Sequence, residues 1–593
     1  MKKIISVLLS AAILASSAIA TSVSASSDND ELQIFTMQTQ EKSDYGFNDY
    51  KFVDKNGNPV FEQNKEDFIP SGKTVNSFSA LPESYDARNE GYVTDAKYQG
   101  DSGNCWAYSV ISVIESERIK KGNDSIENAD YSEAHLAWFT GRPRTENTED
   151  PTHGDGYNLE SPFLSGGNWL MASGTLARWS GIANESDYPY HSNDLSLMTG
   201  YSEDCRYDTS SGAVINSSEV MLDIDDVKQW IYNHGSVTAA IYYNDKYLNE
   251  NNTSYYFNGN SSSNHQITVI GWDDNYSSEK FNSDVNPGNN GAWLCKNSWS
   301  KYWGNEGCFW ISYYDCGINS FAGFTSKEIN ENSNNYTYNG TNYESFTSDD
   351  RRVLSANVFR AKGCEKLTSV SIYTVTEGTD VTVTIYKDIQ ENYKYPNQGT
   401  LAITFDTFIA REGYHTIELP ESVQLAPDSI FSVVIETKDQ NGITHIPLEY
   451  NSSGITYTAG AGESYLNIGG YTKTWVDNTT RGWGNFHIQA FTEDCHSYVN
   501  ETVKSTCQTP GAERVVCEFC GDILSEITYA KGDHIYGEWS EFEPDEHGTN
   551  TSNKICTECG NTITRIDKPG KTVNIAEFFE IIFYLISKLF SVR

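Results

Sequence analysis

Hydrophobic positions recur at helical spacing in the segment that follows residue 105. They are Trp106, Val110, Val113 and Ile114. This spacing predicts a helix over 106–121, and Gly122 directly after two lysines is a common place for a helix to end. A polar, glycine-bearing loop, 99–104 (QGDSGN), comes before the apolar positions. The predicted helix therefore begins close to Cys105.

One apolar run in the middle of the chain predicts a buried strand. This run, 264–272 (NHQITVIGW), opens on an Asn-His pair and closes at a glycine turn. A second segment, 293–299 (WLCKNSW), leads into a glycine-bearing stretch. The polar insert 277–290 lies between the two and contains a Pro-Gly pair, which predicts a surface loop.

The pattern changes after Phe324, where short β-rich runs alternate with turn residues. These runs lie at 353–360, 368–374, 379–386, 415–419, 430–437 and 486–491. Such regular short strands predict an antiparallel, all-β sandwich, which we assign to 326–494. Trp475 and Trp483 would stack on sugars if exposed, whereas packing in the core or at a strand edge is the commoner role of a tryptophan.

Both ends of the chain have patterns of their own. A basic start, an apolar run over 4–20 and small residues up to Ala25 predict a secretory signal peptide of bacterial style over 1–25. Residues 26–80 are polar with weak periodicity, and either an inhibitory propeptide or an N-terminal linker fits them. In 567–593 charges interrupt a hydrophobic run, which favours an amphipathic helix over a membrane span.

Length and charge limit the classes of protein that fit. A chain of 593 residues is too long for one core, so several domains are expected. The formal net charge of −39 disfavours nucleic acid and anionic membranes as partners, since both require basic patches. An acidic protein that is secreted or associated with the cell surface fits better. Twelve cysteines are too few for a disulfide scaffold in a chain of this length.

Residues 495–566 contain two related units, each with a Cys-x-x-Cys-Gly turn. The paired cysteines are Cys517 and Cys520, then Cys556 and Cys559. This spacing predicts zinc-ribbon-like Cys/His repeats, because such a turn presents both sulfurs to one tetrahedral ion. Either the four cysteines share one ion, or each pair binds one with His534 or His547 and Cys507. Disulfides in an exported spacer are the alternative, and the units resemble bacterial surface-display repeats.

Cys105 is the candidate nucleophile. At a helix N-terminus, unpaired backbone N–H groups and the helix dipole favour an anion, and the thiolate is the reactive form of cysteine. A lone cysteine in this setting is more often a buried structural thiol. His265 and Asn297 lie further along the chain and would supply a base and an amide to orient it, which reverses the preference.

These segments resemble the papain-like cysteine proteases. The matching blocks are Gln-Gly with Gly-x-Cys-Trp-Ala around Cys105, Asn-His before the apolar strand, and Asn-Ser-Trp with Trp-Gly and Glu-Gly after it. The segment from Leu81 resembles the start of the mature enzymes. The resemblance implies an α+β, two-lobed protease domain over 81–325. It also implies an exported peptidase that hydrolyses peptides or proteins through a thiolate and an acyl-enzyme, with no cofactor for catalysis.

The resemblance assigns a role to each matching residue. Cys105 would be the nucleophile, His265 the general base, and Asn297 the group that orients the imidazole. Gln99 and the backbone N–H of Cys105 would form the oxyanion hole. The substrate-binding candidates are Gly166, Gly167, Trp169, Asn264 and Trp299.

Departures from the family concern disulfides. Ser102 and Leu164 stand where eukaryotic members carry two bonded cysteines, and the usual partner of Cys205 is missing. Both halves of one disulfide are therefore absent together, while the four catalytic positions are complete. This completeness disfavours a vestigial protease fold kept only for binding, and the Asn-Ser-Trp block disfavours a cell-wall amidopeptidase.

The segments 413–417 (GYHTI) and 425–434 (LAPDSIFSVV) resemble the lectin-like β-domain that follows papain-like domains in some bacterial exported proteins. The resemblance implies glycan or cell-surface ligands for 326–494. No metal or sugar motif in this region identifies the ligand.

Overall fold

A computed structural model gives the structure of the chain. It describes residues 33–39, 50–53, 81–144, 155–330, 332–338, 343–348, 352–449, 455–469, 475–567 and 575–589. The predicted signal peptide lies outside the described residues, and within 26–80 only β1 (Gln33–Thr39) and β2 (Tyr50–Val53) are described. The chain forms two compact units, Met1–Asp494 and Cys495–Arg593.

A helical lobe surrounds the predicted central helix. This helix, α2 (Cys105–Lys121), is buried along most of its length and ends at Gly122, whose φ of 75° is left-handed. Packed with it are α3 (Glu133–Thr140) and α4 (Trp169–Ala177), together with the short helices η1 (Leu195–Met198) and η2 (Glu203–Cys205). The apolar residues at helical spacing thus belong to a helix that other elements cover on most of its sides.

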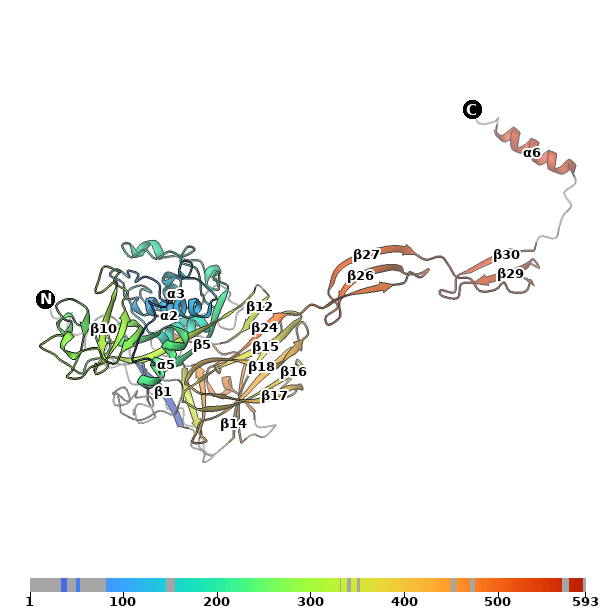
Figure 1. Cartoon of the computed structure of the whole chain (residues 1–593). Helices are drawn as coiled ribbons and strands as arrows, with labels where there is room; N and C mark the ends of the chain where they lie inside the picture. The colour runs from blue at the N-terminus through green and yellow to red at the C-terminus, as the bar shows by residue number, and fades with distance from the viewer. Residues whose placement is uncertain are drawn as a thin grey trace, which may run out of the picture. The chain divides into compact units, whose positions relative to one another are not determined.

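A β lobe packs against the other side of α2, as Figure 1 shows. Its strands are β3 (Ser84–Asp86), β6 (Val237–Ile241), β7 (Ser254–Tyr255), β8 (His265–Asp273), β9 (Ala292–Lys296) and β10 (Cys308–Ser312). The remaining elements are α5 (Ile224–His234), η3 (Asp245–Tyr247), and η4 (Ser278–Lys280) in the predicted surface insert. Trp272, Trp293 and Phe309 fill its core. The strand predicted at 264–272 is β8.

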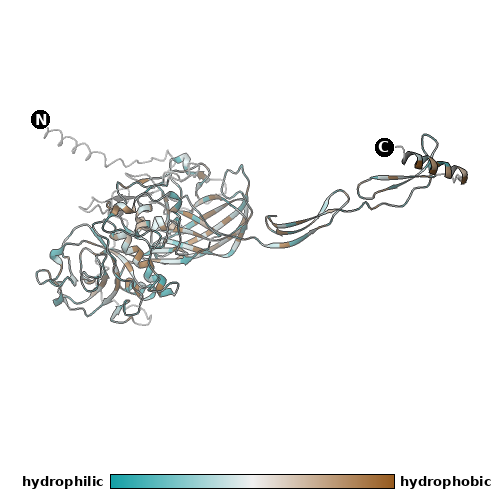
Figure 2. Cartoon of the chain, turned by 90° about the horizontal axis from the view of Figure 1, so that it is seen from above, coloured by the Kyte–Doolittle hydropathy of each residue, from teal (hydrophilic) through white to brown (hydrophobic). Residues whose placement is uncertain are grey.

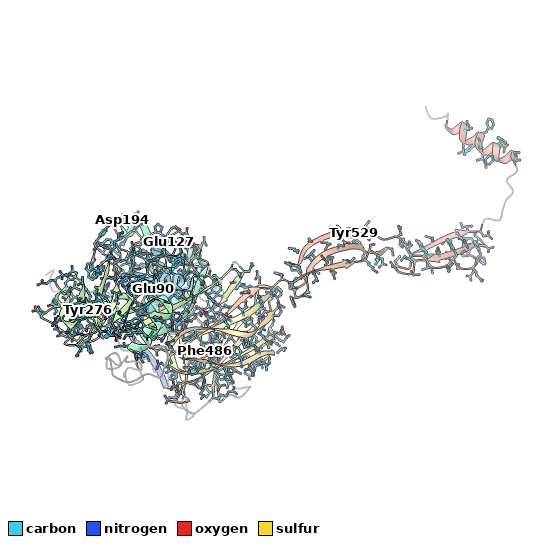
Figure 3. All side chains as sticks on the ribbon, in the orientation of Figure 1. Glu90, Glu127, Asp194, Tyr276, Phe486 and Tyr529 are labelled. Atoms are coloured by element: carbon cyan, nitrogen blue, oxygen red, sulfur yellow. The ribbon has the colours of Figure 1, made fainter. Side chains whose placement is uncertain are left out.

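A β-sandwich follows, as its short strands predict. One sheet has the order β17-β16-β19-β14-β22-β23. Its strands are β14 (Val353–Arg360), β16 (Thr379–Ile389), β17 (Thr400–Ile409), β19 (Ile430–Lys438), β22 (Ser464–Ile468) and β23 (Trp475–Asp477), with η5 (Asn478–Arg481) after it. The facing strands are β12 (Ser333–Tyr336), β15 (Glu365–Thr374), β18 (Gly413–Leu425) and β24 (Ile488–Asp494). Phe486, labelled in Figure 3, is fully buried between the two sheets.

The two domains of the first unit share one sheet. Strands β5 (Ala213–Val220) and β11 (Asn319–Glu328) continue the β lobe, and β5 pairs with β18 of the sandwich. The result is a twelve-stranded sheet across both domains, in which β15, β18 and β5 lie side by side (Figure 1). At the junction Gly413 pairs with Glu219, and a Cβ on Gly413 would lie 1.9 Å from the Ser218 carbonyl oxygen.

Smaller strands complete the first unit. Strands β13 (Tyr343–Ser348) and β20 (Thr444–Glu449) form a separate sheet with β1 and β2. The short strands β4 (Gly156–Tyr157) and β21 (Ile455–Thr456) pair with each other, which makes a second link between the two domains.

The second unit holds two small antiparallel sheets and a helix. The first repeat contains β25 (Tyr498–Val503), β26 (Pro510–Cys517) and β27 (Ile523–Lys531), and the second contains β28 (Glu543–Pro544), β29 (Asn550–Ile555) and β30 (Thr562–Ile566). The helix α6 (Ile575–Leu589) exposes large apolar side chains and is brown in Figure 2. No helix among the described residues has both the length and the apolarity needed to cross a membrane.

Candidate active site

Cys105 is the first residue of α2 and lies at the boundary between the two lobes. Its side chain is buried, and Gln266 of the β lobe offers its backbone N–H to the sulfur. Since Gln266 directly follows His265 in β8, the thiol and the imidazole come from elements that meet at this point. The preceding loop is held closely, because Gly103 N–H donates to the Phe163 carbonyl at 2.8 Å.

The His265 ring is oriented by Asn297. Nε2 of His265 lies 2.9 Å from Oδ1 of Asn297, and the same Oδ1 accepts the Ser298 backbone N–H at 2.8 Å. A backbone N–H only donates, so this bond identifies the Asn297 atom as the oxygen and makes His265 Nε2 the protonated nitrogen. Nδ1 is then the ring nitrogen available to accept a proton.

Trp299 covers this pair. Its ring stacks on His265 with centroids 4.8 Å apart and an interplanar angle of 20°. Tyr243 in turn packs edge-on against Trp299 at 4.7 Å. The apolar cover shields the His265–Asn297 hydrogen bond from water. Such a bond is stronger in this shielded environment than in water. Tyr243 was missed by sequence reasoning, and no local pattern singles it out.

Gln99 is held from both ends of its amide. Its Nε2 donates to the Ser102 carbonyl at 2.7 Å, and its Oε1 accepts from the Ser298 hydroxyl at 2.5 Å. Because Nε2 carries two hydrogens, one remains to donate elsewhere. Ser298 belongs to the Asn-Ser-Trp block already visible in the sequence, but its contact with Gln99 joins residues distant along the chain.

Burial dominates the electrostatics of the site. It raises the pKa of the Cys105 thiol to about 12, against hydrogen bonds from the backbone N–H groups of Gln266, Trp106 and Cys105 itself. It also lowers the pKa of His265 to about 4, and the hydrogen bond to Asn297 acts in the opposite direction. A buried environment disfavours either charge alone, so a thiolate at Cys105 and an imidazolium at His265 each favour the presence of the other.

The substrate-binding candidates do not all have the same surroundings. Gly167 packs so closely on the Trp106 ring that a Cβ would approach it to 2.6 Å, and Gly166 has a left-handed φ of 74°. Asn264 exchanges two hydrogen bonds with the backbone of Tyr243, at 2.7 and 3.0 Å. Trp169, at the start of α4, is half-buried against the helical core. The glycine pair therefore lies beside the nucleophile helix, while the Asn264 side chain is used to hold its own strand.

A cluster of charged groups, of which Glu115 and Glu133 are buried, lies behind the site, and sequence reasoning did not find it. Nζ of Lys97 contacts carboxylates of Glu115 at 3.0 Å, Asp130 at 2.7 Å and Glu133 at 3.0 Å. Burial raises the pKa of Glu133 to about 8, and the neighbouring Lys97 opposes this rise. Lys97 precedes Gln99 by two residues, so the cluster fixes the loop that carries the amide. In the sequence, each of these charged residues is indistinguishable from an ordinary exposed side chain.

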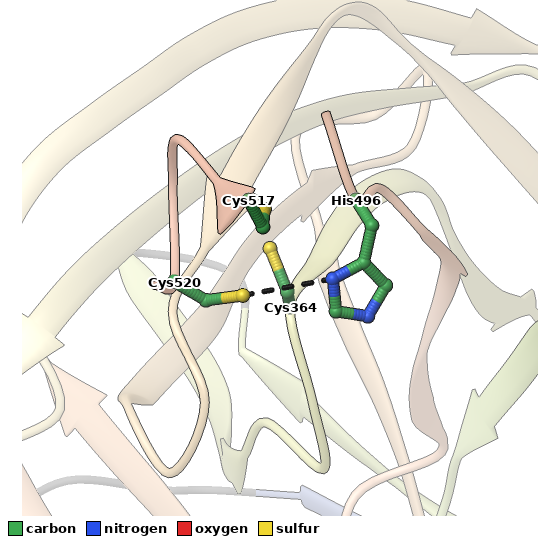
Figure 4. Close-up of side chains that lie close together, drawn as sticks. All are labelled: Cys364, His496, Cys517 and Cys520. Carbon is green, nitrogen blue, oxygen red and sulfur yellow. Dashed lines mark hydrogen bonds between the residues drawn. The ribbon is translucent and has the colours of Figure 1, made fainter. Parts of the chain in front are cut away.

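The second unit brings the predicted cysteines together with histidines in two separate groups. One group contains His496, Cys517 and Cys520, which Figure 4 shows close together. The other contains Cys507, His534, Cys556 and Cys559. His547 is not part of this second group and is exposed beside Glu546. The sequence left open whether the two cysteine pairs share one ion. In the structure the pairs lie in separate groups, and His534, not His547, lies with the second pair.

Comparison with known proteins agrees with this geometry. Residues 81–326 match the model of the papain family of cysteine proteases, and residues 336–492 match that of the lectin like domain. Cathepsin J of Mus musculus is 30% identical over 264 residues, which are 41% of this chain and 65% of that protein. Cysteine proteinase 1 of Entamoeba histolytica is 28% identical over 247 residues, 38% of this chain and 62% of that protein. The chain thus spans less than two thirds of the length of these relatives.

Solved structures show the same two domains in succession. The cysteine protease and lectin-like domains of Cwp84, a surface layer associated protein of Clostridium difficile, align with a TM-score of 0.61 and 26% identity, over 71% of this chain and 91% of that one. Cwp84 after propeptide cleavage aligns with a TM-score of 0.60 and 26% identity, over 70% of this chain and 99% of that one.

The two lobes and the Cys–His–Asn arrangement between them define a cysteine protease domain. Residues 81–326 of this chain belong to the papain family, and a lectin-like domain follows them. The two-lobed α+β fold and the β-sandwich expected from the sequence are both confirmed.

Proposed function

We propose that this chain is an exported cysteine peptidase that hydrolyses peptide bonds through an acyl-enzyme. The observation that carries the proposal is the oriented His265 ring beside the N-terminus of α2, with Nε2 hydrogen-bonded to Asn297 at 2.9 Å. This leaves Nδ1 to receive the proton of Cys105. A thiolate that forms as its proton passes to the imidazole gains a partner charge, which offsets the burial that disfavours either ion alone.

The reaction follows from these positions. Cys105 Sγ attacks the peptide carbonyl carbon, and Gln99 Nε2–H with the Cys105 backbone N–H stabilises the negative oxygen. The C–N bond then breaks, and His265 gives its proton to the leaving amine. Water next adds to the thioester carbon and loses a proton to His265. The C–S bond breaks, the carboxylic acid leaves, and the thiol regains its proton.

The glycine pair Gly166-Gly167 is proposed to bind the extended substrate through its backbone, with Trp169 at the edge of the same site. Support comes from its close packing on Trp106, the residue after the nucleophile. Trp299 contributes by shielding the His265–Asn297 pair. Asn264 contributes by holding the strand before His265 rather than through its own amide, which is bonded to Tyr243.

The test is labelling and hydrolysis by the chain cleaved before Leu81. An epoxide thiol inhibitor should modify Cys105 alone, as read by peptide mass mapping, and Cys105→Ala should abolish hydrolysis of a peptide library. Cys316→Ala is the matched control, since this half-buried thiol lies outside the site, and it should retain activity. Hydrolysis that survives Cys105→Ala would disprove the mechanism.

Residues 26–80 are proposed to restrain the peptidase until they are removed. They precede a segment that resembles the start of mature enzymes, and β1 pairs with β13 of the lectin-like domain, with Phe35 opposite Ser345. The full-length chain should hydrolyse peptides more slowly than a chain that begins at Leu81. Equal turnover by the two forms would assign the segment to a linker.

We propose a carbohydrate ligand for the lectin-like domain, bound at a cavity of about 140 Å³ on its six-stranded sheet. The cavity is lined by Thr382, Thr384 and Tyr386, and by an ion pair between Arg352 and Glu436 at 2.7 Å. Hydroxyls, charges and an aromatic face are groups that bind sugars. Trp475 also lines the cavity but is buried, and Trp483 packs on the core.

Binding to a glycan array tests this assignment. Glu436→Ala should lose the glycans that the unchanged protein retains, whereas Glu391→Ala, which breaks an exposed ion pair with Arg360 elsewhere on the sandwich, should keep them. Equal profiles for both variants would contradict a site at this cavity.

Export to the cell surface is proposed from the basic and apolar N-terminus of the chain. The surface-layer association of Cwp84, the similar solved protein, supports the same location. Fractionation of the producing cells with N-terminal sequencing should find the chain outside the membrane and lacking residues 1–25. Recovery of the uncleaved chain in the cytoplasm would exclude export.

A further inference from the structure

The second Cys/His group draws its four side chains from both C-terminal repeats. His534, Cys556 and Cys559 belong to the second repeat, whereas Cys507 lies in the turn between β25 and β26 of the first. Their potential ligand atoms all lie within 4.8 Å of one another. We propose that these four side chains form a structural zinc site, in which the ion fastens the first repeat to the second.

The distances between the ligand atoms fit a tetrahedral ion. Sγ of Cys507 and Sγ of Cys556 are 3.7 Å apart, and Sγ of Cys559 lies 3.3 Å from Nδ1 of His534. Zn–S bonds of about 2.3 Å and Zn–N bonds of about 2.0 Å at tetrahedral angles place two sulfurs about 3.8 Å apart and a sulfur about 3.5 Å from a nitrogen. Three thiolates and one imidazole are a common ligand set of structural zinc.

The backbone around Cys556 and Cys559 is already arranged for metal binding. Gly560 N–H donates to the Cys556 carbonyl at 3.0 Å, with Gly560 in a left-handed conformation at φ 74°. The Asn561 N–H points to Cys559 Sγ at 3.4 Å, which stabilises negative charge on the sulfur. Nδ2 of Asn561 also lies 3.5 Å from His534 Nε2. With this amide turned over, its oxygen would accept the ring N–H once Nδ1 binds the ion.

The repeats need such a link because they have almost no core. Among residues 495–566, the apolar or sulfur-bearing side chains that are buried are Ala512, Cys517 and Cys556. Strand β27 is exposed along its whole length, and Tyr529 on it, labelled in Figure 3, is nearly half exposed. Units of fewer than about 40 residues usually require a disulfide or a metal to fold, and Cys507, Cys556 and Cys559 form no disulfide in this structure.

The first repeat carries the same arrangement one unit earlier. Nδ1 of His496 lies 3.6 Å from Cys520 Sγ, with Cys517 beside them (Figure 4). His496 stacks on Tyr498 at 5.4 Å, as His534 packs on Tyr536 at 5.5 Å. Recurrence of the His-x-Tyr segment and the cysteine turn indicates that each repeat forms a ligand set, and that Cys507 extends the second set across the repeat boundary.

Zinc analysis of the full-length chain tests the proposal. The protein, purified without chelator, should contain zinc by elemental analysis. Cys507→Ser and His534→Ala should each lower zinc affinity at least tenfold in chelator competition, and both should expose the 531–537 junction to limited proteolysis. His547→Ala is the matched control, because this histidine is exposed and outside the group, and it should match the unchanged protein.

Peptide hydrolysis by each variant confirms that the rest of the chain has folded, since the peptidase residues lie in the other unit. Cobalt substitution supplies a second reading, because loss of the Cys507 thiolate should weaken the sulfur-to-cobalt charge-transfer band by about a third. A chain without zinc, a Cys507–Cys556 disulfide in the peptide map, or unchanged affinity in Cys507→Ser would each overturn the proposal.

Discussion

The Ser298 hydroxyl donates a hydrogen bond of 2.5 Å to the side-chain oxygen of Gln99. With Oε1 held in this way and Nε2 bonded to the Ser102 carbonyl at 2.7 Å, the Gln99 amide has one orientation. Ser298 also directly follows Asn297, whose Oδ1 accepts its backbone N–H. One short segment therefore orients both the base and the proposed oxyanion donor.

Ser298→Ala should lower kcat about tenfold with little change in KM. The substitution removes one hydrogen bond that positions the oxyanion donor, and a buried bond of this kind is worth about 1 to 1.5 kcal/mol. Gln99→Ala should cost more, about a hundredfold, because it removes the donor itself. Steady-state kinetics on one peptide substrate measures both.

Ser298→Thr is the control for this prediction, since it keeps the hydroxyl and should recover most of the rate. In the double variant Gln99→Ala/Ser298→Ala, the second substitution should add almost nothing, because Ser298 acts through Gln99. Additive losses would show that Ser298 has another role.

Asn297→Ala should reduce hydrolysis less than His265→Ala does. Without Asn297, the imidazole loses the partner at 2.9 Å that fixes its tautomer and orientation, yet it still accepts a proton. Without His265, the thiol has no base and its raised pKa keeps it protonated. Single-turnover rates near pH 7 compare the two variants, and equal losses would mean that Asn297 does more than orient the ring.

The local parts of this structure could be predicted from the sequence. Helical spacing and Gly122 located α2, although the helix begins one residue earlier, at Cys105 itself. The run 353–360 coincides with β14, and other runs fall within longer strands. The predicted runs do not include β17, which lies at the edge of its sheet and has many exposed residues.

The contacts between distant segments could not be predicted. The pairing of β5 with β18 depends on residues about two hundred positions apart, and nothing local in either strand specifies its partner. The same holds for Ser298 with Gln99 and for Cys507 with Cys556. The matching blocks identified the catalytic residues because the resemblance covered them. The same blocks include Ser298, but they do not show that its hydroxyl binds Gln99.

Gly413→Ala should destabilise the junction of the two domains by about 2 kcal/mol or more. A Cβ at this position would lie 1.9 Å from the Ser218 carbonyl oxygen, and the φ of +133° disfavours any L side chain. The β5–β18 pairing must therefore open or shift. Thermal unfolding should begin at a lower temperature, and limited proteolysis should cut between the domains sooner.

Gly442→Ala separates the two causes. Gly442 also has a left-handed φ, of +79°, but nothing lies within 4 Å of its added Cβ. This variant should lose only the small amount of stability that a left-handed φ costs an alanine. The domain junction should stay intact. A loss equal to that of Gly413→Ala would show that the junction does not depend on close approach at Gly413.

His135 should make the protein less stable in acid. Burial lowers its pKa to about 4, while the Cys205 carbonyl and Asp208 raise it and Arg206 lowers it. The unfolded chain, with an ordinary value near 6.5, binds the proton more strongly between pH 6.5 and 4. The contribution of the neutral His135 to the free energy of unfolding is therefore present at neutral pH. It is lost as the pH falls through this window, by up to about 3 kcal/mol.

His135→Gln should reduce that loss. The ring Nε2 lies 2.8 Å from the Cys205 carbonyl, and a glutamine amide can replace this donor without titrating. Buried carboxyls such as Glu133, whose pKa is raised to about 8, act in the opposite direction, so the variant must be compared with the unchanged protein at each pH. Urea unfolding at pH 7, 5.5 and 4.5 should show the two curves converging or crossing as the pH falls. His191→Gln, at a partly exposed position, should follow the unchanged protein, and an identical pH dependence for His135→Gln would refute the assignment.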